Sequence, residues 1–478
     1  MKGKKTFNIS KNKNFSEWFT EIIKKSELAD IRYNVKGFVV FQPWSVLSME
    51  KMYKFMEKRL QEKGHMPYFF PTVIPEKNFK KESSHIKGFT PEVFWLEKIK
   101  GEDKLALRPT SETAFYQMFS LWIRSYNDLP FKTYQRANVF RLETKATRPF
   151  LRSREFYWIE SHCAHESKEN AENQVKEDME TTKEVLHDIY GLPFIFFERP
   201  QWDKFPGAEK TFAADVLNPD GRVVQQPSTH LLGKSFSESF NVKFKNKNGK
   251  EEYVWITCYG PAISRIFASI IAVHGDDKGL RFPWRIAPIQ VVITTIGNEK
   301  NIENKAESLK SKLMKEGIDV LVDNSDKSPG EKFYFWEMKG VPLRIEIGKN
   351  EVKEKKLTVY RRDTEKKEKR KESEIMKYIE KVSKEIDKNL TKQADNLFKD
   401  SIVNAKSKAE IKKAIDSGKI ARVSFCSIEK EGIKCAEIIE KEMGARVRGK
   451  NLEHEKAGAK CVICNKKAND VVYVAKDY

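Results

Sequence analysis

Charged side chains of both signs gather in one stretch of the chain, between residues 135 and 165. Within it, Arg141 and Glu143 are two residues apart, so on a strand their side chains would lie on one face. Guanidinium groups suit a phosphate-bearing substrate, because they form fixed pairs of hydrogen bonds to phosphate oxygens. Further polar and aromatic side chains follow in the same stretch: Arg148, Arg152, Arg154, Glu155, Trp158, Glu160 and His162. A single Arg–Glu pair here would more simply be a cross-strand salt bridge, but the whole string predicts a phosphate site.

Cysteine residues form a second chemical group near the end of the chain. Its last eighth holds four of the six cysteines: Cys426, Cys435, Cys461 and Cys464. Cys461 and Cys464 have the C-x-x-C spacing that lets two thiolates reach one tetrahedral ion. A segment this short has little core of its own, so a metal that contributes folding energy is useful there. We predict one structural Zn²⁺ at the four cysteines, without an open catalytic position, and keep His454 as a possible substitute ligand.

Helices are expected to support the charged stretch. An amphipathic helix is predicted from Asn14, which forms a capping box with Glu17. A second is predicted over residues 48–64 and a third over 167–190, each ended by glycine. Between the first two helices and the charged stretch, two prolines keep residues 66–76 extended.

Strands dominate residues 192–258. Two turn signals interrupt them, Pro-Asp-Gly at 219–221 and Asn-Gly at 248–249, and both are typical of hairpins. Hairpins join antiparallel strands, so the first region is predicted to be α+β with a largely antiparallel sheet.

The rhythm of the chain changes after a proline-rich boundary at residues 283–288. Strands and helices then alternate, which predicts a small α/β domain with parallel strands. The predicted elements are strand 289–296, helix 300–317, strand 318–324, and a second helix–strand pair that ends in 341–348 and 356–362. A solvated charge run (364–374) leads into a long helix over 374–407, and a small domain with the clustered cysteines follows. We expect domains at 1–285, 286–392 and 393–478.

Composition narrows the class of protein. The chain of 478 residues has 89 Lys and Arg against 69 Asp and Glu, a net charge of +20 that favours a polyanionic partner. A Lys-rich surface without such a partner is the simpler alternative. No window approaches a membrane span, and the cysteines do not form a disulfide framework, so a cytoplasmic protein is expected. No glycine-rich phosphate loop is present, which excludes the commonest nucleotide folds.

The charged stretch resembles motif 2 of the class II aminoacyl-tRNA synthetases, whose core is Phe-Arg-x-Glu, here Phe140 to Glu143. Residues 68–76 resemble motif 1, and the segment from Gly260 resembles motif 3 running into an anticodon-binding domain. Residues 107–113 (Leu-Arg-Pro-Thr-Ser-Glu-Thr) are similar to the amino-acid loop of the proline, threonine and serine enzymes. The segments 202–216 and 225–236 narrow the resemblance to prolyl-tRNA synthetases of the archaeal and eukaryotic type.

This resemblance implies a fold and an activity. The fold is α+β: an antiparallel-sheet catalytic domain, an α/β anticodon-binding domain and a small zinc-binding α+β C-terminal domain. The activity is that of a proline–tRNA ligase, which forms prolyl-adenylate from L-proline and ATP with Mg²⁺ and then charges tRNA(Pro). The implied partners are these substrates and a second copy of the chain across motif 1, with no membrane. The interval between motif 2 and Gln225 is short, so no inserted editing domain is expected there.

The resemblance also implies roles for single residues. Arg141 and Arg265 would act on the phosphates, and the full set for ATP is Arg141, Glu143, Arg152, Ser153, Gln225, Ser228 and Arg265. The set for proline is Thr110, Glu112, Arg141, Trp158, Glu160, His162, Phe205 and His230. Glu337 and Arg344 would read anticodon bases. Tyr478 would place its carboxylate near the catalytic pocket.

Three positions depart from the expected pattern. Gly260 and Arg265 are one residue farther apart than expected, Tyr259 replaces a frequent Trp, and Ser228-Thr229 reverses the usual order. Two alternatives to a proline–tRNA ligase stay open. One is a related enzyme for another amino acid, such as threonine or cysteine. The other is a non-catalytic RNA-binding paralogue, which should have lost the charged residues at 141, 143 and 265.

Overall fold

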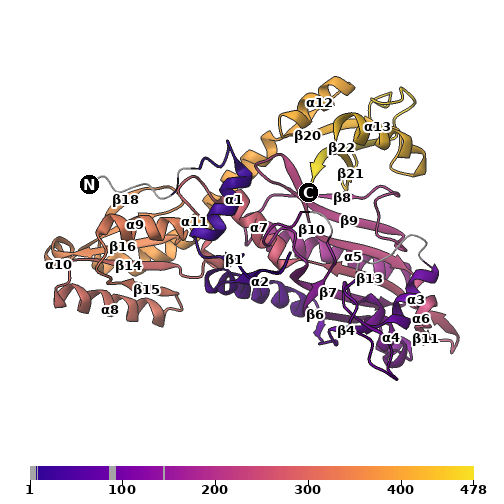
Figure 1. Cartoon of the computed structure of the whole chain (residues 1–478), viewed down its shortest axis with the longest axis horizontal. Coiled ribbons are helices and arrows are strands. Elements are labelled where there is room, and N and C mark those ends of the chain that lie inside the picture. The colour runs from indigo at the N-terminus through magenta and orange to yellow at the C-terminus, as the bar shows by residue number, and fades with distance from the viewer. Residues whose placement is uncertain (1–6, 8, 86–92, 144–145) are drawn as a thin grey trace.

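The computed structural model describes residues 7, 9–85, 93–143 and 146–478. Figure 1 shows three parts: a large sheet with its helices, an α/β block at the left, and a C-terminal block in yellow above the sheet. Within the part of the chain that the structure describes, no helix combines the length and the apolar composition needed to cross a membrane.

The large sheet is antiparallel at its centre, as predicted. Its central strands run in the order β8-β9-β10-β13-β7-β6. Their bounds are β6 (Phe131–Phe140), β7 (Glu155–His165), β8 (Ile195–Glu198), β9 (Lys210–Leu217), β10 (Arg222–Gly233) and β13 (Trp255–Gly260). The Pro-Asp-Gly turn joins β9 to β10, and the Asn-Gly turn joins β11 (Lys243–Lys245) to β12 (Glu251–Tyr253). Both hairpin predictions are confirmed.

Helices pack their apolar faces beside this sheet. They are α1 (Phe15–Lys25), α2 (Pro43–Glu62), α4 (Glu112–Trp122), α5 (Lys168–Thr182) and α7 (Ile263–His274). One hydrophobic cluster joins α1, α2 and α7 through the fully buried Trp18, Met52 and Phe267. The cap at Asn14 is present, because its side chain accepts a hydrogen bond from the Glu17 amide at 3.2 Å.

Two helix limits differ from the prediction. Helix α2 begins at Pro43 rather than at residue 48, because a proline at the first helical position needs no amide partner. Helix α5 begins after the cap Ser167, as predicted, and widens into the π-helical turn η2 (Lys183–His187) before it ends.

The α/β block contains a mixed sheet, in the order β15-β14-β16-β17-β18. Its strands are β14 (Val291–Ile296), β15 (Val320–Asp323), β16 (Leu343–Gly348), β17 (Lys356–Arg361) and β18 (Lys367–Lys371), and its helices are α8 (Lys300–Lys315), α9 (Pro329–Met338), α10 (Lys349–Glu354) and α11 (Ile375–Asp400). The first three strands are parallel, as predicted, but β17 and β18 are antiparallel. The charge run has no buried residue in β18, the edge strand that part of it forms. Lysines are common on such edges because they oppose further strand pairing.

The C-terminal block is continuous with the large sheet. It contains α12 (Lys408–Asp416), α13 (Ile433–Met443), β19 (Ile402–Asn404), β20 (Ile420–Phe425), β21 (Arg446–Asn451) and β22 (Asp470–Asp477). Strand β21 pairs with β8 and strand β22 with β10, so one sheet joins eleven strands of the described part of the chain. Helix α11 ends at Asp400, earlier than the predicted residue 407, because the chain there turns into β19.

A buried ion cluster holds this junction. The Asp215 carboxylate accepts hydrogen bonds from Arg199 at 2.5 Å and from Arg448 at 2.7 Å, and all three side chains are almost fully buried. Paired charges of this kind tolerate burial, whereas removal of one partner leaves an uncompensated charge.

Candidate active site

A cavity of about 480 Å³ opens beside strands β7, β10 and β13. Ten of the residues predicted to bind ATP or proline line it: Thr110, Glu112, Arg141, Glu143, Trp158, Phe205, Gln225, Ser228, His230 and Arg265. The structure therefore brings together side chains that are up to 155 positions apart, from Thr110 to Arg265.

The cationic end of the cavity is formed by Arg141 and Arg265. Arg141 follows the last residue of β6, and its Nε donates a hydrogen bond to the Pro109 carbonyl at 3.0 Å. Arg265 lies in the first turn of α7, and both guanidiniums lie over the ring of Phe156, at 5.3 and 5.9 Å from its centroid. Burial, together with the nearby positive charges of Arg141 and Arg152, lowers the pKa of Arg265 to about 10. Burial also lowers the pKa of Arg141. Both groups stay charged at neutral pH, so this end of the cavity favours an anion.

The expected geometry of Arg141 and Glu143 was wrong in one respect. Strand β6 ends at Phe140, so the two residues do not share a strand face. Instead the chain turns sharply, and the Glu143 amide donates a hydrogen bond to the Arg141 carbonyl at 2.7 Å. The two residues therefore lie in a loop with a tight local turn. The spacing of the two charges in the sequence does not indicate that turn.

Arg152 and Ser153 lie beside the main cavity. They line a small adjoining space together with Arg141, Glu143 and Arg265. The Arg152 Nε atom is 3.6 Å from a Glu143 carboxylate oxygen, and its Nη2 donates a hydrogen bond to the Tyr478 backbone oxygen at 2.6 Å. The last described residue thus reaches the predicted nucleotide side of the site, as expected.

The other end of the cavity is anionic and apolar. Glu112, at the start of α4, is buried and accepts a hydrogen bond from Thr110 at 2.5 Å. The rings of Phe205 and His230 lie 4.9 Å apart, centroid to centroid. Burial lowers the pKa of His230 to about 3, so its imidazole is neutral at physiological pH. This end suits a small cation with an apolar body.

Glu160 and His162 lie beneath this end rather than in its lining. Glu160 accepts hydrogen bonds from the Ser111 hydroxyl at 2.5 Å and from Gln135 at 2.7 Å. His162 Nδ1 is 2.9 Å from the Tyr116 hydroxyl. These contacts fix the loop that presents Glu112, while direct contact of either residue with a substrate stays a prediction.

Cys258 and Phe156 are among the lining residues that were not assigned to the site from the sequence. Cys258, expected only as a small buried residue, lines the cavity from β13. The ring of Phe156, which also lines the cavity, lies under the guanidiniums of Arg141 and Arg265. For Cys258 a signal was available, because it is two residues from Gly260 and therefore shares its strand face.

The predicted anticodon residues also meet. Glu337, in α9, lies 3.3 Å from Arg344, on β16, and Arg344 also contacts Glu346 at 3.1 Å. Aromatic rings flank the Arg344 guanidinium, with Phe333 at 4.1 Å and Tyr360 at 4.3 Å.

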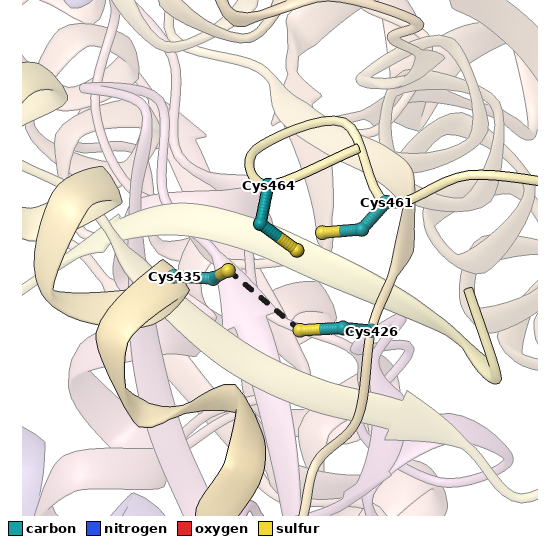
Figure 2. A group of neighbouring side chains, drawn as sticks. All are labelled: Cys426, Cys435, Cys461 and Cys464. Atoms are coloured by element: carbon teal, nitrogen blue, oxygen red, sulfur yellow. Dashed lines mark hydrogen bonds between the residues drawn. The ribbon is translucent and has the colours of Figure 1, made fainter. Parts of the chain in front are cut away.

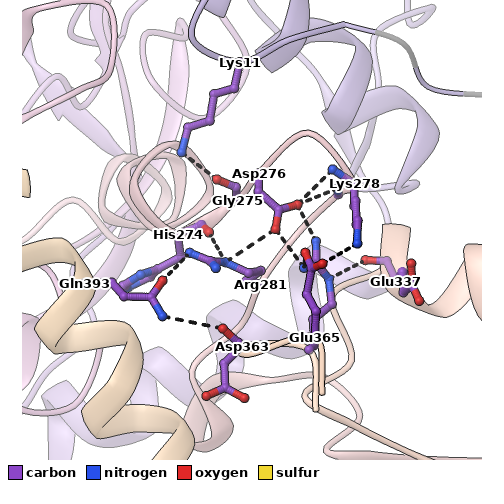
Figure 3. Close-up of polar contacts among 12 residues, drawn as sticks. Lys11, His274, Gly275, Asp276, Lys278, Arg281, Glu337, Asp363, Glu365 and Gln393 are labelled. Atoms are coloured by element: carbon purple, nitrogen blue, oxygen red, sulfur yellow. Dashed lines mark hydrogen bonds and ion pairs between the residues drawn. The ribbon is translucent and has the colours of Figure 1, made fainter. Parts of the chain in front are cut away.

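A polar network joins the Glu337 segment to the end of helix α7 (Figure 3). The buried Arg362 donates hydrogen bonds to both carboxylate oxygens of Asp276, at 2.8 and 2.5 Å, and one to the Glu337 carbonyl at 3.2 Å. Asp276 lies two residues after His274, the last residue of α7, and Arg281 donates a hydrogen bond to the His274 carbonyl at 2.6 Å. The α/β block is thereby fixed to the helix that carries Arg265.

The four clustered cysteines point toward one another (Figure 2). Their sulfur atoms all lie within 4.8 Å of one another, and Cys426 Sγ is 3.7 Å from Cys435 Sγ. Two thiolates on one tetrahedral zinc, each about 2.3 Å from it, are separated by about 3.8 Å. The donor set and its spacing therefore fit zinc. His454 is not part of this cluster.

Comparisons with known proteins cover nearly the whole chain. The model "tRNA synthetase class II core domain (G, H, P, S and T)" matches residues 94–274, the "Anticodon binding domain" 290–382, and "Prolyl-tRNA synthetase, C-terminal" 408–478. The proline–tRNA ligase of Thermofilum pendens is 46% identical, over 98% of each chain. That of Pyrococcus horikoshii is 40% identical, over 97% of this chain and 98% of its own.

Solved structures agree with these sequences. The Giardia lamblia prolyl-tRNA synthetase in complex with prolyl-adenylate superposes with a TM-score of 0.95 and 37% identity, over 99% of this chain and 100% of its own. The Cryptosporidium parvum enzyme complexed with L-proline and AMP gives 0.91 and 28%, over 99% of each chain.

Proposed function

The chain belongs to the prolyl-tRNA synthetase family of class II, and on this premise we propose how its residues act. It is an ATP-dependent proline–tRNA ligase, which activates L-proline to prolyl-adenylate and transfers the prolyl group to tRNA. The observation that carries the residue roles is that the guanidiniums of Arg141 and Arg265 line one cavity together with the buried Glu112 carboxylate.

In the activation step, the proline carboxylate attacks the α-phosphorus of ATP. One oxygen–phosphorus bond forms, the bond to the β-phosphate oxygen breaks, and pyrophosphate leaves. Arg141 and Arg265 would stabilise the negative charge that develops on the phosphorus oxygens, because their positive charges are already in place before the reaction begins. No side chain needs to act as a nucleophile, so catalysis consists of positioning and electrostatics.

The nucleotide would lie along the cationic end. Glu143, Arg152 and Ser153 would hold the nucleoside, and the Ser153 hydroxyl is buried without a hydrogen-bond partner among the described residues. Gln225 and Ser228 line the same cavity with oxygen donors of the kind that Mg²⁺ prefers. Bound with ATP there, Mg²⁺ would neutralise phosphate charge.

Proline would occupy the anionic and apolar end. Its secondary ammonium would pair with the Glu112 carboxylate, and Thr110 would keep that carboxylate in place. Trp158, Phe205 and His230 would surround the pyrrolidine ring, with Glu160 and His162 supporting the loop from below. The neutral His230 adds no positive charge that would oppose the ammonium.

Surface charge and exposed apolar side chains support two further partners, tRNA and a second copy of the chain. The +20 charge and the Glu337–Arg344 pair support binding of tRNA(Pro). In the extended segment expected at a dimer interface, Met66 is 61% and Phe69 is 88% exposed, which supports a homodimer that covers them. The four cysteines would hold a structural Zn²⁺. A cytoplasmic location remains the expectation from the sequence.

Proline specificity can be tested by ATP–pyrophosphate exchange with each of the twenty amino acids. We expect exchange that depends on proline, with weaker exchange at most for smaller analogues. Exchange that depends on threonine or cysteine instead would favour another enzyme of the subclass. Absence of exchange with every amino acid, in folded protein that binds tRNA, would favour the non-catalytic alternative.

A further inference from the structure

We propose that Glu112, His162 and Cys258 form a second metal site, at the floor of the amino-acid pocket. It would take a thiophilic divalent ion such as Zn²⁺ or Cd²⁺ and, when filled, exclude proline. This inference rests on the proposed place of proline at Glu112. The site would be inhibitory and separate from the four-cysteine cluster.

The three side chains converge from three elements. Glu112 begins α4, His162 lies on β7 and Cys258 lies on β13, directly opposite His162 in the antiparallel pairing. All three are buried, and their candidate ligand atoms lie within 4.8 Å of one another. The chain therefore supplies one oxygen, one nitrogen and one sulfur donor at a single point.

One separation already matches a bound ion. Cys258 Sγ is 3.7 Å from Glu112 Oε1. With Zn–S near 2.3 Å and Zn–O near 2.1 Å, a tetrahedral ion holds these two atoms about 3.6 Å apart. The candidate ligand nitrogen of His162 lies within 4.8 Å of both atoms and would have to move toward them to become the third ligand.

The neighbours of these residues orient them as the outer partners of metal ligands do. The Tyr116 hydroxyl contacts His162 Nδ1 at 2.9 Å, which leaves Nε2 as the ligand atom. Thr110 donates to Glu112 Oε2 at 2.5 Å, which leaves Oε1 toward Cys258. The competing contact of His162 Nε2, to Glu160, is long at 3.4 Å, and Glu160 already accepts hydrogen bonds from Ser111 and Gln135.

The charge of the bound ion explains why the filled site can be buried and why it would exclude proline. When the ion binds, the Cys258 thiol loses its proton to solvent and forms a metal–sulfur bond. The ion's two positive charges are then balanced by one thiolate and one carboxylate. The same ion occupies the Glu112 oxygen that would face proline and places positive charge where the ammonium must lie. Inhibition should therefore be competitive with proline.

Cadmium is the sharper probe, because cadmium–thiolate bonds absorb in the ultraviolet. The test starts from full-length protein whose four-cysteine cluster has been filled with Cd²⁺. Further Cd²⁺ should add one equivalent with a new thiolate absorption, and saturating proline should abolish that addition. In exchange assays the apparent KM for proline should rise linearly with Cd²⁺ while kcat is unchanged, and a chelator should reverse the effect.

Cys163 provides a matched control, because it is also buried but lies next to His162 on β7 and so faces the other side of the sheet. Cys258→Ser should lose the added absorption, and Cys163→Ser should keep it. If Cys258→Ser does not fold, the competition between Cd²⁺ and proline in the unaltered protein still decides. No added equivalent, loss of it in Cys163→Ser instead, or inhibition independent of proline would overturn the proposal. Because absorption reports the ion directly, protein that binds Cd²⁺ but lacks proline-dependent exchange would contradict the proposed function alone.

Discussion

At the scale of single residues, the active site depends on two positive charges held close together. Arg141 and Arg265 lie against the same aromatic ring, and each has a pKa lowered by burial. Keeping two such groups close together costs free energy in the empty protein. A bound phosphate relieves that cost, and a transition state with more negative charge relieves it further.

Arg141→Ala and Arg265→Ala should therefore each slow proline-dependent exchange by about a hundredfold or more, equivalent to about 3 kcal/mol of transition-state stabilisation. Both variants should keep the circular dichroism of the parent protein. Arg59→Ala, which removes an exposed guanidinium paired with Glu62, is the control and should exchange normally. Near-parental activity of either active-site variant would show that the phosphate assignment is mistaken.

Asp178 should make the stability of the protein depend on pH. Burial raises the pKa of this carboxyl to about 7, from 3.8, although it accepts hydrogen bonds from Thr229 and Gln174. The folded state thus binds the proton more tightly than the unfolded state. Its stabilising effect is full below about pH 4 and is lost as pH rises to about 7.

Asp178→Asn should consequently raise the melting temperature at pH 8 and change it little at pH 4. The gain is bounded by the pKa difference, about 4 kcal/mol. The new amide can donate to the Gln174 side-chain oxygen, which is buried without a partner among the described residues. Asp188→Asn alters an exposed carboxyl and is the control. An equal shift at both pH values would argue against a protonated Asp178.

At the scale of elements, the catalytic helix α7 is held at both ends. Arg265 lies in its first turn, and the loop after His274 is fixed to the α/β block by the pair of Asp276 with Arg362. Arg362→Ala should leave Asp276 without its main partner and destabilise the protein by about 3–5 kcal/mol. Denaturant unfolding measures this, and Lys278→Ala, which breaks the more exposed pair with Glu365, should cost less than about 1 kcal/mol. Similar losses in both variants would contradict a special role for Arg362.

Glu337 allows the two blocks to be tested separately. Its carboxylate contacts Arg344, whereas only its carbonyl takes part in the junction with Arg362. Glu337→Ala should therefore impair charging of tRNA and leave exchange without tRNA almost intact. Equal losses in the two assays would count against anticodon recognition by this side chain.

Sequence patterns predicted some elements far better than others. Hairpins β9–β10 and β11–β12 followed from local turn residues, and the cavity residues followed from a family resemblance. By contrast, the turn at Arg141 and the antiparallel β17 and β18 depend on backbone closure and strand neighbours that no local pattern encodes. Glu160 and His162 were expected to line the pocket, yet their depth is set by Ser111 and Tyr116, which belong to a different element.

At the scale of the whole molecule, the C-terminal block is part of the active-site architecture. Strand β22 leads from the cysteine cluster to the contact between Tyr478 and Arg152. The sequence does not reveal that the C-terminal block joins the large sheet. The buried Asp215 pairs there with both Arg199 and Arg448, which are far apart in the sequence.

Loss of the zinc should therefore disturb the nucleotide side of the active site, where Tyr478 contacts Arg152. Cys461→Ser combined with Cys464→Ser should abolish the single zinc per chain that native mass spectrometry is expected to detect. It should also lower the melting temperature and weaken exchange. His454→Ala should keep the zinc, because His454 lies outside the cluster. A metal-free protein of equal stability and activity would refute a structural ion.

The pairing of β21 with β8 cannot form until late in the synthesis of the chain. Residues 450 and 451 pair with 198 and 197, so this contact spans about half of the chain. While the ribosome is still making residues 200 to 445, β8 is an edge strand with unpaired amides and carbonyls, a template for pairing with other chains. Contacts of such long range form slowly. A truncated or stalled nascent chain would therefore be prone to aggregate. The large sheet beside the active site gains the β21–β8 pairing only near the end of synthesis.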